Sequence, residues 1–304
     1  MKYILLSALI LTTSHFQLSA QDSSRDNSKL HFTAGVTFVT VPTYNISGTD
    51  TSFNNSLSVA PSLGLGINGF SAIYSPKFVT GGSNPGIYMH AVTLEYSQYD
   101  KPIADFAFEY THMFFNNNPS VPYTPLNNEI YTALTLKKSW IRPKLAAGLG
   151  FGNVKATNTT TSYSGYDFGL SAGIGHNFSW DNNKVSYTLA PSIYLNGGTS
   201  QYFSFLKISQ YIGHGKNFGK YTKKGIGANR GNGRRGGGGV ITTTTTPSSS
   251  GSSFSLNNVE GNLESSVEIG SFTVRPTASL FIPVGTAAGS GVTSFWQISI
   301  QYKF

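Results

Sequence analysis

The feature that most constrains this chain is an alternation of apolar and polar residues with a period of two. In the last segment every second residue is apolar: Trp296, Ile298, Ile300, Tyr302 and Phe304. The segments 257–269 and 272–284 follow the same pattern. Successive side chains of a β-strand point to opposite faces, so this period predicts strands with one apolar and one polar face.

Twelve such segments follow one another along the chain, and we predict one strand in each: 29–41, 57–67, 70–79, 88–98, 103–115, 128–138, 141–156, 165–180, 184–197, 257–269, 272–284 and 294–304. Five links are short: 68–69, 99–102, 139–140, 181–183 and 270–271. Six links are longer: 42–56, 80–87, 116–127, 157–164, 198–256 and 285–293. An even number of such strands, with short turns at one end and long loops at the other, is typical of an all-β, up-and-down transmembrane β-barrel. A water-soluble sandwich also alternates, but it has no reason to sort its links by length.

Composition excludes several other classes of protein. Only 11% of the residues are charged and there is no cysteine, which rules out disulfide scaffolds, zinc ribbons and cysteine nucleophiles. After residue 20 no apolar stretch reaches the ~18 residues that a membrane-spanning helix needs. Aromatic residues make up 13% of the chain, which disfavours disorder.

The first twenty residues have the pattern of a cleavable signal peptide. Lys2 precedes an apolar run over 4–11, and Leu18-Ser19-Ala20 supplies a small residue before the expected cut. The alternative is an N-terminal membrane anchor, although the apolar run is short for a span. We therefore expect residues 1–20 to be removed and 21–304 to form a single barrel domain.

These features together resemble a Gram-negative outer-membrane β-barrel protein. The last strand ends with Tyr302 and Phe304, and this terminal aromatic resembles the assembly signal that the barrel-assembly machinery reads. The texture rich in Asn, Ser and Thr is similar to that of outer-membrane barrels from Bacteroidetes. The resemblance covers 29–304 and implies an outer-membrane location, both termini in the periplasm, and contact with outer-membrane lipid and the assembly machinery. It implies no functional family and no cofactor.

Charged residues of the predicted strands fall mostly on the polar face, which points into the lumen of a barrel. The predicted lumen charges are Glu95, Asp105, Glu109, Lys137, Arg142, Lys144, Glu260, Glu264, Glu268, Arg275 and Lys303, with Glu129 and Asp167 on the same face. Two clusters result: Glu95, Asp105, Lys137, Arg142 and Lys144 toward the periplasmic end of the fourth to seventh strands, and Glu264, Glu268, Arg275 and Lys303 on the last three. A hairpin centred on Gly270-Ser271 puts Arg275 opposite Ser266 and within reach of Glu264 and Glu268. The clusters are consistent with a charge-selective path or with a plug of salt bridges.

Glycines make the same inner face small on several strands, for example at Gly64, Gly66, Gly173 and Gly175. We expect them to leave room for a ligand or an inserted loop.

The long link 198–256 is basic and rich in Gly, Ser and Thr, and we expect 214–255 to be largely disordered. Its basic residues are Lys216, Lys220, Lys223, Lys224, Arg230, Arg234 and Arg235. At a cell surface such a loop suits anionic polysaccharide, lipid A or another outer-membrane protein, rather than nucleic acid. The alternative is a solvated loop without a dedicated partner.

The sequence therefore limits the function to a few classes of protein and does not identify a substrate or partner. The first expectation is a non-enzymatic barrel whose loops bind or support a partner, and the second is a narrow porin-like channel for small polar solutes. A lipid-modifying enzyme is third, because His90 and His112 are expected roughly opposite each other on the lipid-facing side near the outer rim. No serine is placed beside them as a nucleophile, and no metal-ligand spacing occurs. We predict no catalytic residue, cofactor or metal.

Overall fold

The computed structural model describes residues 30–47, 50–98, 101–116, 126–155, 162–182, 185–199, 254–284 and 292–304. These residues form thirteen strands: β1 (His31–Ser47), β2 (Asp50–Ile67), β3 (Phe70–Val79), β4 (Gly86–Gln98), β5 (Ala104–Phe115), β6 (Asn128–Leu136), β7 (Arg142–Lys155), β8 (Ser162–Gly175), β9 (Phe178–Asn182), β10 (Val185–Gly198), β11 (Ser255–Ile269), β12 (Phe272–Pro283) and β13 (Thr293–Lys303). In this part of the chain no helix has the length and apolarity to cross a bilayer.

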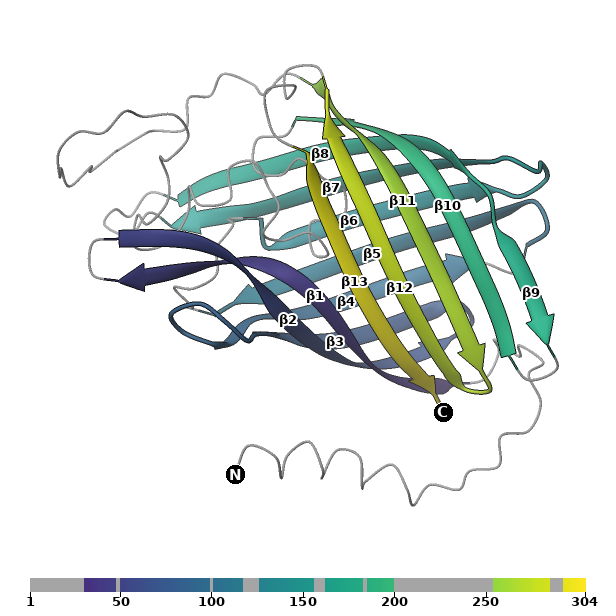
Figure 1. Cartoon of the computed structure of the whole chain (residues 1–304), viewed down its shortest axis with the longest axis horizontal. Coiled ribbons are helices and arrows are strands. Elements are labelled where there is room, and N and C mark those ends of the chain that lie inside the picture. The colour runs from purple at the N-terminus through teal and green to yellow at the C-terminus, as the bar shows by residue number, and fades with distance from the viewer. Residues whose placement is uncertain are drawn as a thin grey trace.

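The strands form a closed antiparallel barrel (Figure 1). Consecutive strands pair along the chain, and β13 pairs with β1 to close the sheet. β8 and β9 pair with the same strand, β10, one after the other, so the thirteen strands occupy twelve positions in the wall. The structure therefore confirms the predicted fold class and the twelve-strand up-and-down order. A closed sheet leaves no unpaired strand edge, which a bilayer interior demands.

Two of the short links are tight turns, as predicted from their sequence. Ile67 pairs with Phe70 across Asn68 and Gly69, whose φ angles of 52° and 82° are those of a type I′ turn. Ile269 pairs with Phe272 across Gly270, which has a φ of 58°. These turns set the register of both hairpins.

One long link was predicted wrongly. The segment 42–56 is not a loop over most of its length, because β1 and β2 stay paired as far as Ser47 and Asp50. This outer part of the hairpin lacks strict alternation. Beyond the bilayer no lipid selects apolar residues on one face, so a period-two search ends before the strand does.

The predicted strand 165–180 is divided between β8 and β9 at His176 and Asn177. The pairings Ser192–Gly175 and Leu189–Phe178 keep one register on both sides of the break. That register sets Pro191 opposite His176, and proline has no N–H to donate to the ladder. The carbonyl of Pro191 still accepts from the His176 N–H at 3.1 Å. The interruption is local and leaves the wall continuous.

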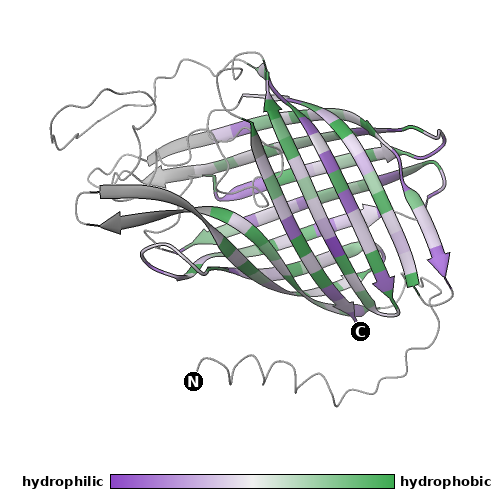
Figure 2. Ribbon diagram, viewed as in Figure 1, coloured by the Kyte–Doolittle hydropathy of each residue, from purple (hydrophilic) through white to green (hydrophobic). Residues whose placement is uncertain are grey.

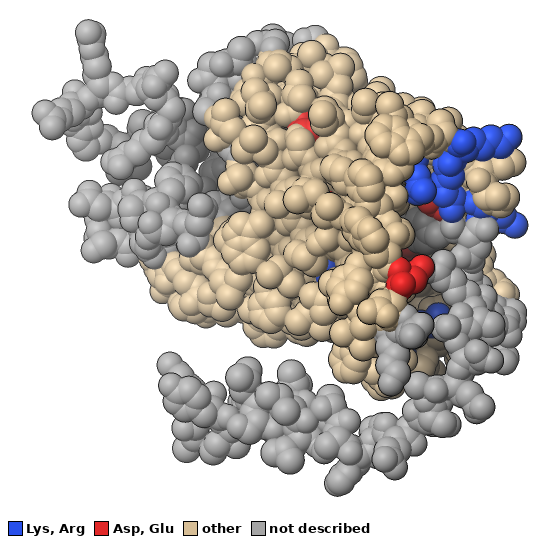
Figure 3. All heavy atoms as spheres, turned by 45° about the vertical axis from the view of Figure 1, so that its right-hand side comes forward, with Lys and Arg blue, Asp and Glu red and all other residues tan. Residues whose placement is uncertain are grey.

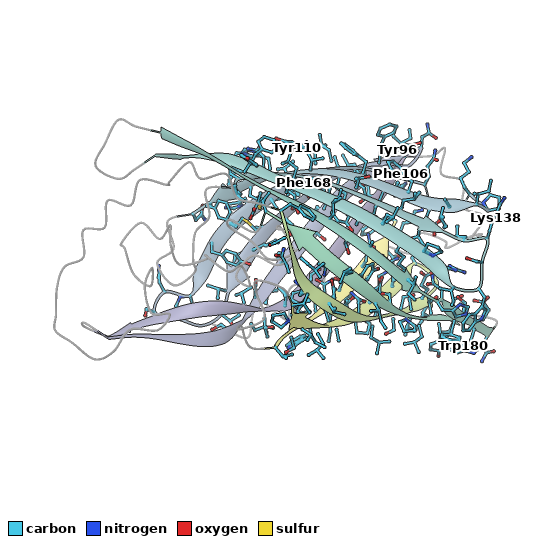
Figure 4. The ribbon with its side chains drawn as sticks, turned by 90° about the horizontal axis from the view of Figure 1, so that it is seen from above. Tyr96, Phe106, Tyr110, Lys138, Phe168 and Trp180 are labelled. Carbon is cyan, nitrogen blue, oxygen red and sulfur yellow. The ribbon has the colours of Figure 1, made fainter. Side chains whose placement is uncertain are left out.

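The outer face of the wall is apolar and is bounded by aromatic side chains. Figure 2 shows the alternation along β11 to β13, and Figure 3 shows an almost uncharged wall with Lys and Arg gathered at the end of the barrel that carries the short turns. In Figure 4, Tyr96, Phe106 and Trp180 point outward toward this short-turn end, and Tyr110 and Phe168 lie nearer the other end. An apolar band between two aromatic girdles is the pattern of a transmembrane barrel.

Both ends of the barrel-forming chain meet at the short-turn end. The Phe304 N–H donates to the Phe32 carbonyl at 2.9 Å, and Lys303 pairs with Thr33. The ring of Tyr302 lies 4.6 Å from that of Phe272 and 4.7 Å from that of Phe304. The last three residues therefore contribute both to closing the sheet and to the aromatic girdle.

We expect deletion of 302–304 to lower the assembled fraction strongly, and Phe304→Ala to lower it less, because alanine keeps the backbone hydrogen bond to Phe32. The measurement is the heat-modifiable fraction in membranes. Phe272→Ala is the matched control, because it removes another ring from the same girdle without touching the terminus. Normal assembly of the deletion variant would contradict a role for this terminus.

Candidate functional site: a polar cavity beneath an apolar layer

The inward-facing side chains enclose a cavity of about 680 Å³. Seven of the predicted lumen charges line it: Glu95, Asp105, Glu109, Lys144, Glu260, Glu264 and Arg275. Lys77 lines it too, and the remaining wall combines Ser, Thr, Asn, Gln, Tyr131 and Tyr194 with about as many apolar residues. Lys137, Arg142, Glu268 and Lys303 lie outside this lining, toward the turns. A cavity of this size is within the range that holds a small molecule.

The first charged cluster is brought together in part. Lys137 Nζ lies 2.6 Å from Asp105 Oδ1, and the two side chains are 20% and 22% exposed. Glu95 and Glu109 are direct cross-strand partners on the inner face. Lys144 extends away from them, and its Nζ lies 5.7 Å from the centroid of the Tyr194 ring. The cluster is therefore a set of separate contacts around the wall.

The second cluster has the predicted register but no ion pair. Val267 pairs with Val274 and Glu264 with Thr277, which leaves Arg275 opposite Ser266 as expected. Glu264 and Arg275 are exposed to solvent. Within the described chain no ion pair joins Arg275 to Glu264 or Glu268. These side chains form a solvated mouth to the cavity at the short-turn end.

Arg275→Ala is accordingly expected to change the free energy of unfolding by no more than about 1 kcal/mol, the range for exposed ion pairs. Thermal melting in detergent, with and without 0.5 M salt, provides the measurement. A loss of about 3–5 kcal/mol, the cost of breaking a buried pair, would instead support a salt-bridged plug.

A buried network of polar side chains lies deeper in the cavity wall. Asn196 Nδ2 donates to Asn258 Oδ1 at 2.9 Å and to Glu260 Oε2 at 3.0 Å. Asn262 Nδ2 donates to Ser279 Oγ at 3.1 Å and to Glu260 Oε1 at 3.4 Å. Asn196 and Asn258 were not singled out from sequence. Their position on the inner face was visible by parity, but an uncharged amide in a polar chain carries little signal.

An apolar layer crosses the lumen at the long-loop end. We give this name to nine buried residues that form one packed cluster: Val39, Val41, Val79, Tyr88, Met89, Met113, Leu126, Phe281 and Phe295. Met113 on β5 and Phe281 on β12 lie six positions apart in the twelve-position wall, so the cluster joins opposite sides of the barrel. Val39 and Phe281 also line the cavity, so the apolar layer forms its inner end.

The apolar layer was not predicted from the sequence, from which we expected any closure of the lumen to come from charged side chains. The available signal was a break in alternation near the long loops. In Leu280-Phe281-Ile282 and in Met113-Phe114-Phe115 both faces of the strand are apolar. Such runs mark places where the inner face no longer meets water.

The inner-face glycines do not leave open space, which corrects the sequence-based expectation. A Cβ at Gly173 would come within 2.4 Å of the Ile193 carbonyl oxygen and of the Tyr194 ring. A Cβ at Gly64 would come within 2.5 Å of Thr33 Oγ1. Neighbouring side chains already lie over these glycines, so the glycines are needed for close packing.

His90 and His112 are on the lipid-facing side, but they are not opposite each other. His90 pairs with Phe114, and His112 pairs with Val92, an offset of two residues. His90 Nδ1 lies 2.7 Å from the Tyr74 hydroxyl, and His112 Nδ1 lies 2.7 Å from Asn128 Oδ1. Each histidine is therefore anchored to a different neighbouring strand. The described residues include no group of three or more His, Asp or Glu able to hold a metal.

The signal peptide and the seven basic residues of the 198–256 link lie outside the described residues. Their predicted roles stay predictions.

Three of the solved structures to which the chain is similar share 6–7% of its sequence. No family model and no curated protein matches the chain. The NanC porin covers 88% of this chain and 100% of its own, at 7% identity and a TM-score of 0.38. LpxR from Salmonella typhimurium covers 89% and 99%, at 6% identity and a TM-score of 0.41. The beta domain of the Bordetella autotransporter BrkA covers 90% and 98%, at 7% identity and a TM-score of 0.32.

Proposed function

We propose that this chain is a non-enzymatic outer-membrane β-barrel whose lumen is closed at rest, and that it acts as a surface binding or structural accessory component. The apolar layer is the observation that carries the proposal. Nine packed apolar side chains join opposite walls of the barrel, and a hydrated ion loses its water only at high cost in such surroundings. Such a layer would block an open diffusion channel.

The wall supports the outer-membrane location. Its outer face is apolar between aromatic girdles, and the short turns gather at the end that holds the C-terminus. In outer-membrane barrels the short turns face the periplasm, so both termini would be periplasmic and the long loops would face outward. Membrane lipid and the barrel-assembly machinery are then the obligatory partners. The 198–256 link is the proposed contact for anionic polysaccharide, lipid A or another outer-membrane protein.

The surroundings of the two lipid-facing histidines support the non-enzymatic proposal. Nδ1 of His90 is hydrogen-bonded to Tyr74 and Nδ1 of His112 to Asn128, and among the described residues neither ring is hydrogen-bonded to a serine or a carboxylate. Asn128 Nδ2 donates to Asn127 Oδ1 at 2.8 Å, which points its oxygen toward His112 as an acceptor. A nucleophile–base pair needs a different arrangement. Anchoring of polar aromatic groups at the membrane interface explains both residues.

A narrow channel is the second candidate, because a polar, charged cavity of about 680 Å³ is more than a structural barrel needs. In that case part of the apolar layer would have to move. Leu126 is the candidate, because it lies in the link that precedes β6 and not on a strand.

Conductance separates the two candidates. We expect purified protein in a planar bilayer to give no stepwise current at moderate voltage. We also expect protein from the outer-membrane fraction to migrate as a heat-modifiable band. Steady single-channel steps from the native chain would favour the channel. Equal migration of boiled and unboiled samples, with the protein in the soluble periplasm, would contradict the barrel location.

A further inference from the structure

One row of cross-strand partners crosses the inner wall of the cavity and combines opposite chemistries. Lys144 pairs with Gly173, Gly173 with Tyr194, Tyr194 with Glu260, and Glu260 with Phe281. Side chains of direct cross-strand partners are neighbours on one face of a sheet. The row therefore presents a cation, an aromatic ring, a carboxylate and an apolar ring in sequence around the lumen.

The lack of a side chain at Gly173 allows Lys144 and Tyr194 to approach each other. With no Cβ at this position, the Tyr194 ring lies over the Gly173 backbone. Lys144 extends across the same gap, and its Nζ lies 5.7 Å from the Tyr194 centroid. A positive group thus lies close to the strand that pairs with Glu260.

Asn196 holds the carboxylate of Glu260 in place. Its Nδ2 donates to both Asn258 and Glu260, which fixes the orientation of the amide. Its Oδ1 is buried and has no hydrogen-bond partner among the described residues, so Asn196 acts on the cavity through its Nδ2 and Glu260.

We infer that this cavity is a binding site for a small zwitterion, an amino acid or short peptide. It is reached from the short-turn end, and the ligand ammonium is held by Glu260 and the ligand carboxylate by Lys144. An apolar ligand side chain would pack against Tyr194 and Phe281, where the apolar layer ends the cavity. The mixed lining suits a ligand that carries both charges, since carboxylates and basic groups are both present. A purely anionic ligand would meet Glu95, Glu109 and Glu264 on its way in.

This inference rests on the proposed closed lumen in one respect only: a solute that enters would stay bound and not pass through. Binding can be measured in detergent, where conductance has no influence. A conducting barrel that binds the zwitterion would refute the closed lumen alone, and a silent barrel that does not bind it would refute this inference alone.

The probe is the dipeptide Gly-Phe, compared by calorimetry with N-acetyl-Gly-Phe and Gly-Phe-amide. Each blocked peptide lacks one of the two charges. We expect each to bind about tenfold or more weakly than Gly-Phe, which corresponds to the loss of one charge-assisted hydrogen bond. Equal binding of all three peptides, or tighter binding of glucose than of Gly-Phe, would overturn the inference.

Variants then assign each charge to its residue. Glu260→Gln should weaken the binding of Gly-Phe about tenfold and leave the binding of N-acetyl-Gly-Phe almost unchanged. Lys144→Met should weaken the binding of Gly-Phe about tenfold and leave the binding of Gly-Phe-amide almost unchanged. This pairing of variant and ligand distinguishes a lost contact from a damaged fold. Asp181→Asn and Lys138→Met remove the same charges at exposed positions outside the cavity, and should leave Gly-Phe binding unchanged. Weakening of all three peptides alike by Glu260→Gln would contradict the assigned role.

Discussion

Truncating the apolar layer at its centre is expected to turn a silent barrel into a conducting one. Met89 and Met113 are 0% and 1% exposed and extend from the adjacent strands β4 and β5 into the lumen. The double variant Met89→Ala/Met113→Ala removes two flexible side chains from the apolar layer. We expect stepwise currents in a planar bilayer, where the native chain gives none, because water can then connect the polar cavity to the long-loop end.

The same variant should also lose stability. Removing one buried methionine side chain from a packed core costs about 2–5 kcal/mol, so the melting temperature in detergent should fall clearly. Phe114→Ala is the matched control, because Phe114 is the next residue on β5, faces outward and is 53% exposed. It should give no current and only a small change in melting. A double variant that stays both silent and stable would show that the apolar layer does not seal the lumen.

A second large effect is expected when an arginine is placed on the lipid-facing side of β12. The same change on the lumen side should have little effect. Ala278 on β12 faces outward between Leu263 and Trp296, which are 48% and 42% exposed. In a bilayer Ala278→Arg puts a charge into the apolar band, which costs about 2–4 kcal/mol near the midplane. We expect this variant to assemble poorly, and the folded fraction in lipid vesicles at increasing urea measures the loss.

Thr277→Arg is the control for that experiment, because it makes the same change one residue away on the lumen face. Thr277 lines the cavity and pairs with Glu264, so the new guanidinium meets water and a carboxylate. Its effect should stay within about 1 kcal/mol. Equal losses from the two variants would mean that the outer wall does not face lipid.

The features that could be predicted from this sequence are those that depend on each residue's own surroundings and on its near neighbours in the chain. Lipid outside and water inside impose alternation residue by residue, so strand positions, inner and outer faces and the even strand number could be predicted. Turn chemistry is equally local: Asn68-Gly69 and Gly270-Ser271 set the registers of their hairpins, and the register around Arg275 was predicted from the second of these. Where the bilayer ends, as in the outer part of the β1–β2 hairpin, the pattern stops and the prediction of a loop was wrong.

The candidate site was decided by the closure of the sheet. Met113 and Phe281 are far apart in the sequence and meet only because β13 pairs with β1 and brings opposite walls around one lumen. Lys144, Tyr194 and Glu260 fall into one row through the registers of three separate strand pairs, and no single segment contains that information. By itself the sequence determined which residues point inward. Which of them touch, and so where the lumen is apolar and where it is polar, depended on barrel curvature and register, because contacts across a lumen join residues that no local pattern relates.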